Sequence, residues 1–254
     1  MGTASTDATF DLYPLRFRFE TCKLRDFSGN GLRGAFGSAF KKIDEGAYAR
    51  YFSPRAVANS GPSGLGDPPR PFVFRLAAPL EAGLNVFLTR EPGVELFKQA
   101  VAALGKLSSV AGTERLRLSL SAQARPVYRL RVHFLTPTEL KGADRPEFGI
   151  LMARIRDRVS TLRELYGEGP LEIDFKAFGA RASCVSMTRC ELVPVAAERT
   201  SRSTGQRHSL GGFTGLAQYE GDVSEFLPYL EIARWTGVGR QTVWGKGEIA
   251  YETL

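Results

Sequence analysis

Alternating apolar and charged residues predict a β-strand near the start of the chain. Residues 15–20 read LRFRFE, so every second side chain is apolar, which is the pattern of a strand with one buried face. The spacing then changes, because apolar residues recur at helical intervals through GNGLRGAFGSAFKKI, with Ser28 before this run as an N-cap. We therefore expect a strand followed by a helix from Ser28 to Ile43.

The rest of the first half predicts a hairpin, a helix and one more strand. Residues 72–76 and 84–88 alternate on either side of a short turn that contains Pro and Gly. Residues 94–104 carry apolar side chains three or four positions apart, and residues 115–120 alternate again. The predicted order is β-α-β-β-α-β, in which an antiparallel sheet carries both helices on one face.

The second half repeats this order. Residues 129–134 read RLRVHF and predict a strand whose solvent side is basic, and residues 148–166 carry the apolar stripe of a long helix. Residues 182–193 and 210–219 predict paired strands, joined by the basic stretch AERTSRSTGQRH.

The end of the chain completes the second repeat. Asp222 and Glu225 resemble a capping box at the start of a helix that runs through Trp235. A last strand is expected over residues 242–251. Each half is thus predicted to be one βαββαβ unit.

The fold class expected from this pattern is α+β, with two tandem ferredoxin-like (βαββαβ) domains at residues 1–125 and 126–254. A chain of 254 residues is long enough for two domains of ordinary size. Hydrophobic residues make up 43% of it, charged residues 24%, and the mean hydropathy is −0.16. These values indicate packed cores rather than disorder.

The sequence predicts a cytoplasmic protein without membrane contact. No run of eighteen or more apolar residues occurs, and the first nine residues do not resemble a signal peptide. Cys22, Cys184 and Cys190 are an odd number at spacings that match no zinc motif, so we expect buried thiols in a reducing compartment and no structural metal.

Basic residues are clustered, and this favours a polyanionic partner. The formal net charge is +7 and the pI about 9.5. The stretch from Arg16 to Lys42 holds seven basic residues and two acidic ones, and Arg199, Arg202 and Arg207 form a second group. Such surfaces attract nucleic acid and release counterions on binding.

A glycine-rich segment lies between the predicted last helix and strand. Glycine lets backbone N–H groups approach phosphate oxygens without a side chain in the way, so the segment can bind RNA. Tight turns that close the last strand explain the glycines equally well, and the segment fits neither a Walker loop nor a dinucleotide fingerprint. The residues concerned are Gly237, Gly239, Arg240, Gly245, Lys246 and Gly247.

At this point a family resemblance becomes specific. The run GGFTG…YEGDVSEFLPYLEIARWTGVGRQTVWGKGEI resembles the C-terminal signature of the CRISPR-associated repeat-processing endoribonucleases, the sixth Cas family of the RAMP superfamily. GNGLRGAFGSAF, AYARYFSP, PFVFR and LRVHFLTPTELK resemble the family's first helix, the loop and strand after it, and the first strand of its second domain. The likeness spans nearly the whole chain and is strongest over the last fifty residues.

The resemblance implies two RAMP domains that bind CRISPR repeat RNA, in the precursor and as the mature guide, and cut it without a metal or cofactor. In that chemistry the 2′-OH attacks the adjacent phosphorus and leaves a 2′,3′-cyclic phosphate and a 5′-OH. The alternative is a catalytically inactive RAMP protein that holds CRISPR RNA beside other Cas proteins in an effector complex. The oligomeric state, monomer or homodimer, stays open.

The catalytic residues are the point at which the sequence departs from the family. Many members carry a general-base histidine on or just after the first helix, but residues 1–132 contain no histidine. Lys41, Lys42 and Tyr48 occupy that neighbourhood, where a lysine can stabilise the charged transition state. A solvated helix end explains the two lysines equally well. His208, in the basic hairpin, is the other catalytic candidate. The polar character of an exposed hairpin also explains this histidine without a catalytic role.

The remaining candidates are RNA contacts. The three hairpin arginines have no obvious role in folding, and the resemblance implies that this hairpin meets the base of an RNA stem. Arg33 can contact phosphate or cover apolar neighbours with its stem. The other three candidates project from the solvent side of the strand at residues 129–134, namely Arg129, Arg131 and His133.

Overall fold

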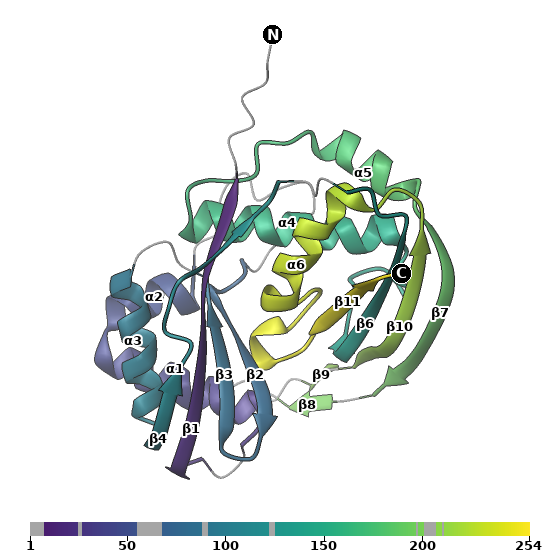
Figure 1. The fold of residues 1–254 in the computed structure, drawn as a ribbon. Coiled ribbons are helices and arrows are strands. Elements are labelled where there is room, and N and C mark those ends of the chain that lie inside the picture. The colour runs from purple at the N-terminus through teal and green to yellow at the C-terminus, as the bar shows by residue number, and fades with distance from the viewer. Residues whose placement is uncertain are drawn as a thin grey trace. The chain divides into compact units, whose positions relative to one another are not determined.

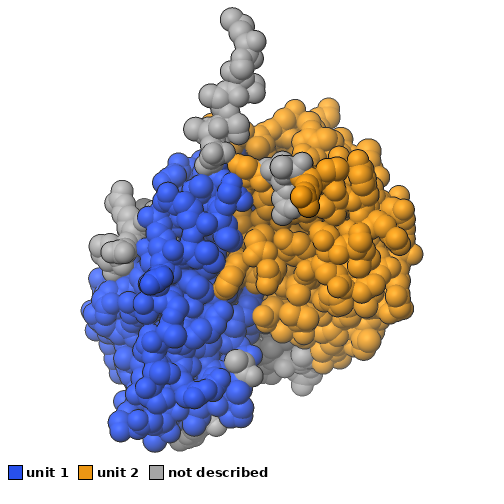
Figure 2. Space-filling view, in the orientation of Figure 1, with its two compact units in different colours: residues 1–119, 157–171, 243–245 blue, residues 120–156, 172–242, 246–254 orange. Residues whose placement is uncertain are grey.

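The computed structural model describes residues 8–24, 27–54, 68–87, 91–121, 125–196, 198–200, 207–209 and 211–254. Two antiparallel sheets carry the helices (Figure 1). The chain forms two compact units, coloured in Figure 2. The first unit comprises residues 1–119, 157–171 and 243–245, and the second comprises residues 120–156, 172–242 and 246–254. The expected domain boundary after residue 125 stays a prediction.

The sheet of the first unit has the strand order of a ferredoxin-like fold. Its order is β2-β3-β1-β4, with antiparallel neighbours throughout, so the first strand lies between the third and the fourth. A further strand, β5, pairs with the first residues of β1. The strands are β1 (Thr9–Cys22), β2 (Phe72–Ala78), β3 (Glu81–Val86), β4 (Gly105–Ala111) and β5 (Leu116–Ser119).

Three helices accompany this sheet, and two of them are capped as their sequences suggest. The helices are α1 (Gly29–Ile43), α2 (Glu45–Phe52) and α3 (Glu91–Ala102). Ser28 Oγ accepts a hydrogen bond from Gly31 N at 3.1 Å, which confirms the predicted N-cap of α1. Asp44 accepts from Ala47 N at 2.8 Å and caps α2 in the same way.

An aromatic cluster around Phe36 of α1 forms the core of the first unit. Five rings lie with their centroids 5.3 to 5.9 Å from that of Phe36. They come from α1, α2, α3 and β2, so these helices share one face of the sheet. The five are Phe40, Phe52, Phe72, Phe74 and Phe97.

The sheet of the second unit repeats the same order, β11-β6-β10-β7. Phe226 anchors its core, with ring centroids 5.2 Å from Phe148 and 5.0 Å from Phe178. The tandem ferredoxin-like α+β fold is therefore confirmed. The elements of the second half of the chain are β6 (Arg129–Thr138), α4 (Phe148–Tyr166), α5 (Phe175–Ser183), β7 (Ser186–Val195), β8 (Glu198–Thr200), β9 (Arg207–Ser209), β10 (Gly212–Glu220), α6 (Leu227–Thr236) and β11 (Ile249–Thr253), with 3-10 turns η1 (Ser224–Phe226) and η2 (Thr242–Trp244). Residues 157–166 of α4 and 243–244 of η2 belong to the first unit.

The strand predicted over residues 115–120 forms as β5, but it is not the fourth strand of the ferredoxin-like order. Residues 105–111 form that strand as β4, whereas residues 116–119 pair with the start of β1. The sequence GKLSSVA of β4 has no clear alternation, because five of its seven side chains are exposed. Its pairing with β1 makes it a strand, and a period-two search cannot detect that.

Two predicted strand boundaries and one predicted helix cap in the second half were also wrong. The strand expected from residue 182 begins at Ser186, because α5 occupies the preceding residues. The last strand begins at Ile249, because η2 occupies residues 242–244. The expected capping box does not form, since the Glu225 carboxylate accepts hydrogen bonds from Arg181 at 2.6 and 2.9 Å.

The cysteines do not lie in the core as expected. Cys184 is exposed, and Cys22 and Cys190 are partly exposed, so the prediction of buried thiols was wrong. Within the described ranges, His, Cys, Asp and Glu side chains form no group that could hold a metal ion. No helix in the described part of the chain is long and apolar enough to cross a membrane.

Candidate nucleic-acid interface

The glycine-rich segment, residues 237–247, depends on left-handed backbone conformations. Its four glycines have φ between 66° and 84°, a region that side chains rarely adopt. Two of them also approach neighbouring backbone closely. A Cβ on Gly239 would lie 2.3 Å from the Glu139 carbonyl oxygen, and one on Gly247 would lie 1.9 Å from that of Val238. The segment therefore requires glycine at both positions.

Backbone hydrogen bonds fix the glycine-rich segment against itself and against the end of β6. Val238 N donates to Gly247 O at 2.8 Å, and Gly247 N donates to Pro137 O at 3.1 Å. Arg240 N donates to Glu139 O at 3.0 Å. These bonds hold the backbone in one conformation, so the side chains of the segment are presented in a defined way. RNA contact through its glycine amides stays a prediction.

The two cations of the glycine-rich segment lie in different environments. Arg240 is exposed, and its Nη1 atom lies 2.7 Å from Glu139 Oε1. Lys246 Nζ is buried and has no hydrogen-bond partner among the described residues. Burial lowers the pKa of Lys246, while the nearby charge of Glu139 acts in the opposite direction. Arg240 is therefore available at the surface, whereas the Lys246 ammonium is held out of water.

Residues 243–245 of the segment pack on α1 and β2 within the first unit. The Arg33 guanidinium lies over the Trp244 ring, 5.6 Å from its centroid. A Cβ on Gly245 would lie 3.3 Å from the Phe74 carbonyl oxygen. Arg33, a candidate RNA contact, therefore also contacts an aromatic ring of the glycine-rich segment. No sequence pattern pointed to Trp244.

Two candidates on β6 share one carboxylate. Arg131 Nη1 lies 2.6 Å from Glu252 Oε1, and His133 Nε2 lies 3.2 Å from the same atom. The hydrogen bonds from His133 and Arg131 lower the pKa of Glu252. Both residues lie on the solvent side of β6, as does the exposed Arg129. Glu252, which sequence reasoning missed, sits in β11 directly opposite Arg131.

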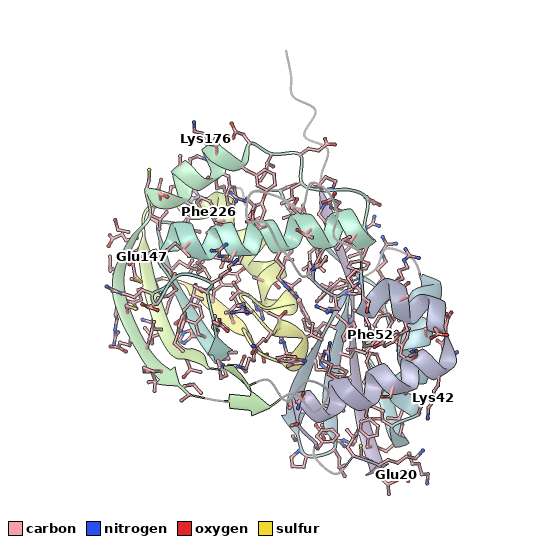
Figure 3. All side chains as sticks on the ribbon, turned by 180° about the vertical axis from the view of Figure 1, so that it is seen from behind. Glu20, Lys42, Phe52, Glu147, Lys176 and Phe226 are labelled. Atoms are coloured by element: carbon pink, nitrogen blue, oxygen red, sulfur yellow. The ribbon has the colours of Figure 1, made fainter. Side chains whose placement is uncertain are left out.

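The catalytic candidates near α1 gather where α1 meets α2. Lys41 Nζ lies 3.3 Å from Glu45 and 5.9 Å from the centroid of the Tyr48 ring. Tyr48 stacks on Phe52 at 4.7 Å with an interplanar angle of 14°. Lys42 is exposed at the end of α1 (Figure 3). Two cations and a phenol thus share this corner, and catalytic roles for them stay a prediction.

The basic hairpin is described only through its backbone. β8 and β9 pair antiparallel, with Arg199 opposite His208. The side chains of Arg199, Arg207 and His208, and the whole of Arg202, lie outside the described part of the chain. Their expected roles, RNA contact for the arginines and catalysis for His208, stay predictions.

The fold defines the class first: an α+β protein with two tandem ferredoxin-like sheets. The family model described as CRISPR-associated endoribonuclease Cas6 matches residues 132–249, a range that includes most of β6 and the whole glycine-rich segment. The resemblance seen in the sequence is therefore confirmed. No curated protein sequence matches the chain significantly.

Solved structures agree with the fold. The structure named "Cas6 (TTHB231) product complex" is 15% identical with a TM-score of 0.59, over 96% of this chain and 100% of that one. "Thermus thermophilus Cas6 (TTHB231)" is 16% identical with a TM-score of 0.58, over 99% and 100%. The "Partial Cas6-RT-Cas1--Cas2 complex" is 9% identical with a TM-score of 0.50, over 99% of this chain and 47% of that one. At such identities the likeness is one of fold.

Proposed function

We propose that this protein binds the repeat RNA of a precursor CRISPR transcript and cuts it without a metal to give the mature guide. The observation that carries the proposal is the Cas6 family match over residues 132–249. The chain's net charge of +7 supports it, because RNA binding depends on cationic surface. Other Cas proteins are proposed partners, in line with the composition named for one structural neighbour.

The reaction needs few groups from the protein. The 2′-oxygen attacks phosphorus, the bond from phosphorus to the 5′-oxygen breaks, a base takes the 2′-proton and an acid protonates the leaving oxygen. Cations stabilise the extra negative charge on the transition state, and binding holds the in-line geometry. We assign Lys42 and Lys41 to charge stabilisation. Tyr48, beside Lys41, and His208 are the candidate proton-transfer groups.

One observation favours a second function, RNA binding without cleavage. The first 132 residues contain no histidine, and His133 is engaged with Glu252 at 3.2 Å. If no group acts as base, the same fold holds RNA while another enzyme cuts it. Incubation of the protein with labelled repeat RNA in EDTA tests the two. A product with a 2′,3′-cyclic phosphate supports the nuclease, and intact bound RNA supports the binding module.

A further inference from the structure

The Glu139 carboxylate acts on both cations of the glycine-rich segment. Its Oε1 atom accepts a hydrogen bond from Arg240 Nη1 at 2.7 Å. Burial lowers the pKa of Lys246, and the negative charge of Glu139 opposes that shift. The three residues belong to the second unit, so this small cluster lies within one compact part of the chain. Glu139 is therefore an anion placed at the cations that are candidate RNA contacts.

Backbone contacts hold Glu139 against the glycine-rich segment. Arg240 N donates to Glu139 O at 3.0 Å, and a Cβ on Gly239 would lie 2.3 Å from the same carbonyl oxygen. The preceding residue, Thr138, is fully buried at the end of β6. The main chain of Glu139 is thus fixed on both sides, so its side chain starts from a defined position beside Arg240.

The pair of Glu139 and Arg240 is open to solvent and can therefore be exchanged. The Arg240 side chain is 60% exposed and the Glu139 side chain 30%. Exposed ion pairs contribute little to stability, because water screens the charges and two long side chains lose freedom. A guanidinium group binds phosphate oxygens in the same bidentate manner as carboxylate oxygens. An RNA phosphate can thus replace the carboxylate without loss of the fold.

Lys246 is the second cation that an incoming anion meets. Its Nζ atom is buried and has no hydrogen-bond partner among the described residues. A buried ammonium group without an acceptor is unfavourable. Glu139 relieves this cost through its charge, but it donates no oxygen to a hydrogen bond with Nζ. The environment of Lys246 therefore also favours the arrival of further acceptor oxygens at the segment.

We propose that the Glu139 carboxylate occupies the place of an RNA phosphate beside Arg240 in the free protein, and that RNA displaces it on binding. This rests on the proposed function, which identifies the anion as RNA. Displacement costs every RNA the same, because Glu139 must give up its pair with Arg240. RNA that makes few contacts is then released first, whereas repeat RNA is retained through its additional contacts. Glu139 is thus a specificity-determining residue that acts through Arg240.

The test compares two carboxylates that pair with exposed arginines. Glu139→Gln removes the charge and keeps the side-chain shape and the backbone contacts. Glu225→Gln is the matched control, because the Glu225 side chain is 34% exposed and pairs with Arg181, which is 55% exposed.

Binding of two RNAs is measured from low to high salt: repeat RNA with a 2′-deoxy block at the cut site, and an unrelated RNA of the same length. Glu139→Gln should tighten both complexes about threefold and steepen the salt slope by roughly 0.7, because Arg240 then takes up a phosphate without a competitor. Glu225→Gln should leave both quantities nearly unchanged. Equal effects of the two variants would overturn the proposal.

A double-mutant cycle shows whether Glu139 acts through Arg240. In an Arg240→Ala background the carboxylate has lost its partner, so Glu139→Gln should change RNA affinity by less than about 1.5-fold. The full gain in that background would reveal a general effect of charge and would contradict the proposal.

A polyanion without base sequence separates this proposal from the proposed function. On immobilised heparin, Glu139→Gln should elute at higher salt than Glu225→Gln, because heparin also binds through anionic oxygens. Elution of both variants at the same salt concentration would overturn the role of Glu139. If the parent does not prefer repeat RNA to the unrelated RNA, the proposed function fails, while the elution from heparin still decides on Glu139.

Discussion

Gly29 and Trp244 contact each other through their backbones, because a Cβ on Gly29 would lie 2.1 Å from the Trp244 carbonyl oxygen. One turn further along α1, the Arg33 guanidinium covers the Trp244 ring. The first residue of α1 is thus matched to the glycine-rich segment at a position where only glycine fits. This contact joins two of the sequence motifs that carried the family resemblance.

Substitution of Gly29 should therefore be far more damaging than substitution of another glycine on the same helix. Gly29→Ala places a methyl group against backbone, so we expect the free energy of unfolding to fall by about 1–3 kcal/mol. Gly34→Ala is the control, because no atom of the described residues lies within 4 Å of its added Cβ. It should raise stability by roughly 0.5–1 kcal/mol. Chemical denaturation measures both, and equal losses would show that the close contact does not matter.

We expect Lys246 to lower the free energy of unfolding and to contribute to RNA binding. Lys246→Met removes a buried ammonium without a hydrogen-bond partner among the described residues, so the free energy of unfolding should rise by about 1 kcal/mol while RNA affinity falls. Because the folded-state pKa is lowered, the parent should gain stability relative to the variant as pH rises from neutral toward 10.5. Lys176→Met, at an exposed position on α5, is the control. A destabilised Lys246→Met would contradict this account.

The regular parts of the fold could be predicted because the apolar and polar side chains of each element alternate with one constant period. Helix α4 has the predicted bounds, since its apolar stripe repeats without interruption over Phe148–Tyr166. Strand β4 could not be found in this way. Val110 on it is 42% exposed, and only pairing with residues more than eighty positions earlier makes it a strand.

The candidate interface could likewise be predicted only in part from the sequence. Alternation along β6 correctly placed Arg131 and His133 on the solvent side, but it could not reveal that both contact Glu252, over a hundred residues away. Likewise, a local capping pattern suggested a role for Glu225, whereas a distant arginine takes its carboxylate. Such pairs depend on tertiary structure, which outweighs local preference.

The two candidate catalytic sites, near the end of α1 and in the basic hairpin, can be separated by single variants. We expect Lys42→Ala to lower the cleavage rate about tenfold to a hundredfold if it stabilises the transition state, and His208→Ala to lower it if the imidazole transfers a proton. Lys42 is exposed, so folding should be unaffected. Lys106→Ala, which removes an exposed lysine paired with Glu20 at 2.6 Å, is the control. If both variants cut at the parental rate, this placement of the chemistry is wrong.

The hairpin arginines should contribute to RNA binding through charge. Replacement of Arg199, Arg202 and Arg207 together should weaken binding steeply and reduce the salt slope by about one unit per lost phosphate contact. Three arginines that are already paired with carboxylates provide a matched control of equal charge change. An unchanged slope in the hairpin variant would remove the hairpin from the interface. The control replaces Arg181, Arg189 and Arg234.

The central claim is cleavage of repeat RNA by the 2′-OH without a metal, and the ends of the product test it most directly. Purified protein is incubated with end-labelled repeat RNA in excess EDTA, beside the same RNA carrying a 2′-deoxy residue before the cut. We predict one cut in the unmodified RNA, leaving a 2′,3′-cyclic phosphate and a 5′-OH, and none in the blocked RNA. Cleavage that requires a divalent ion, or cleavage of the blocked RNA, would contradict the account.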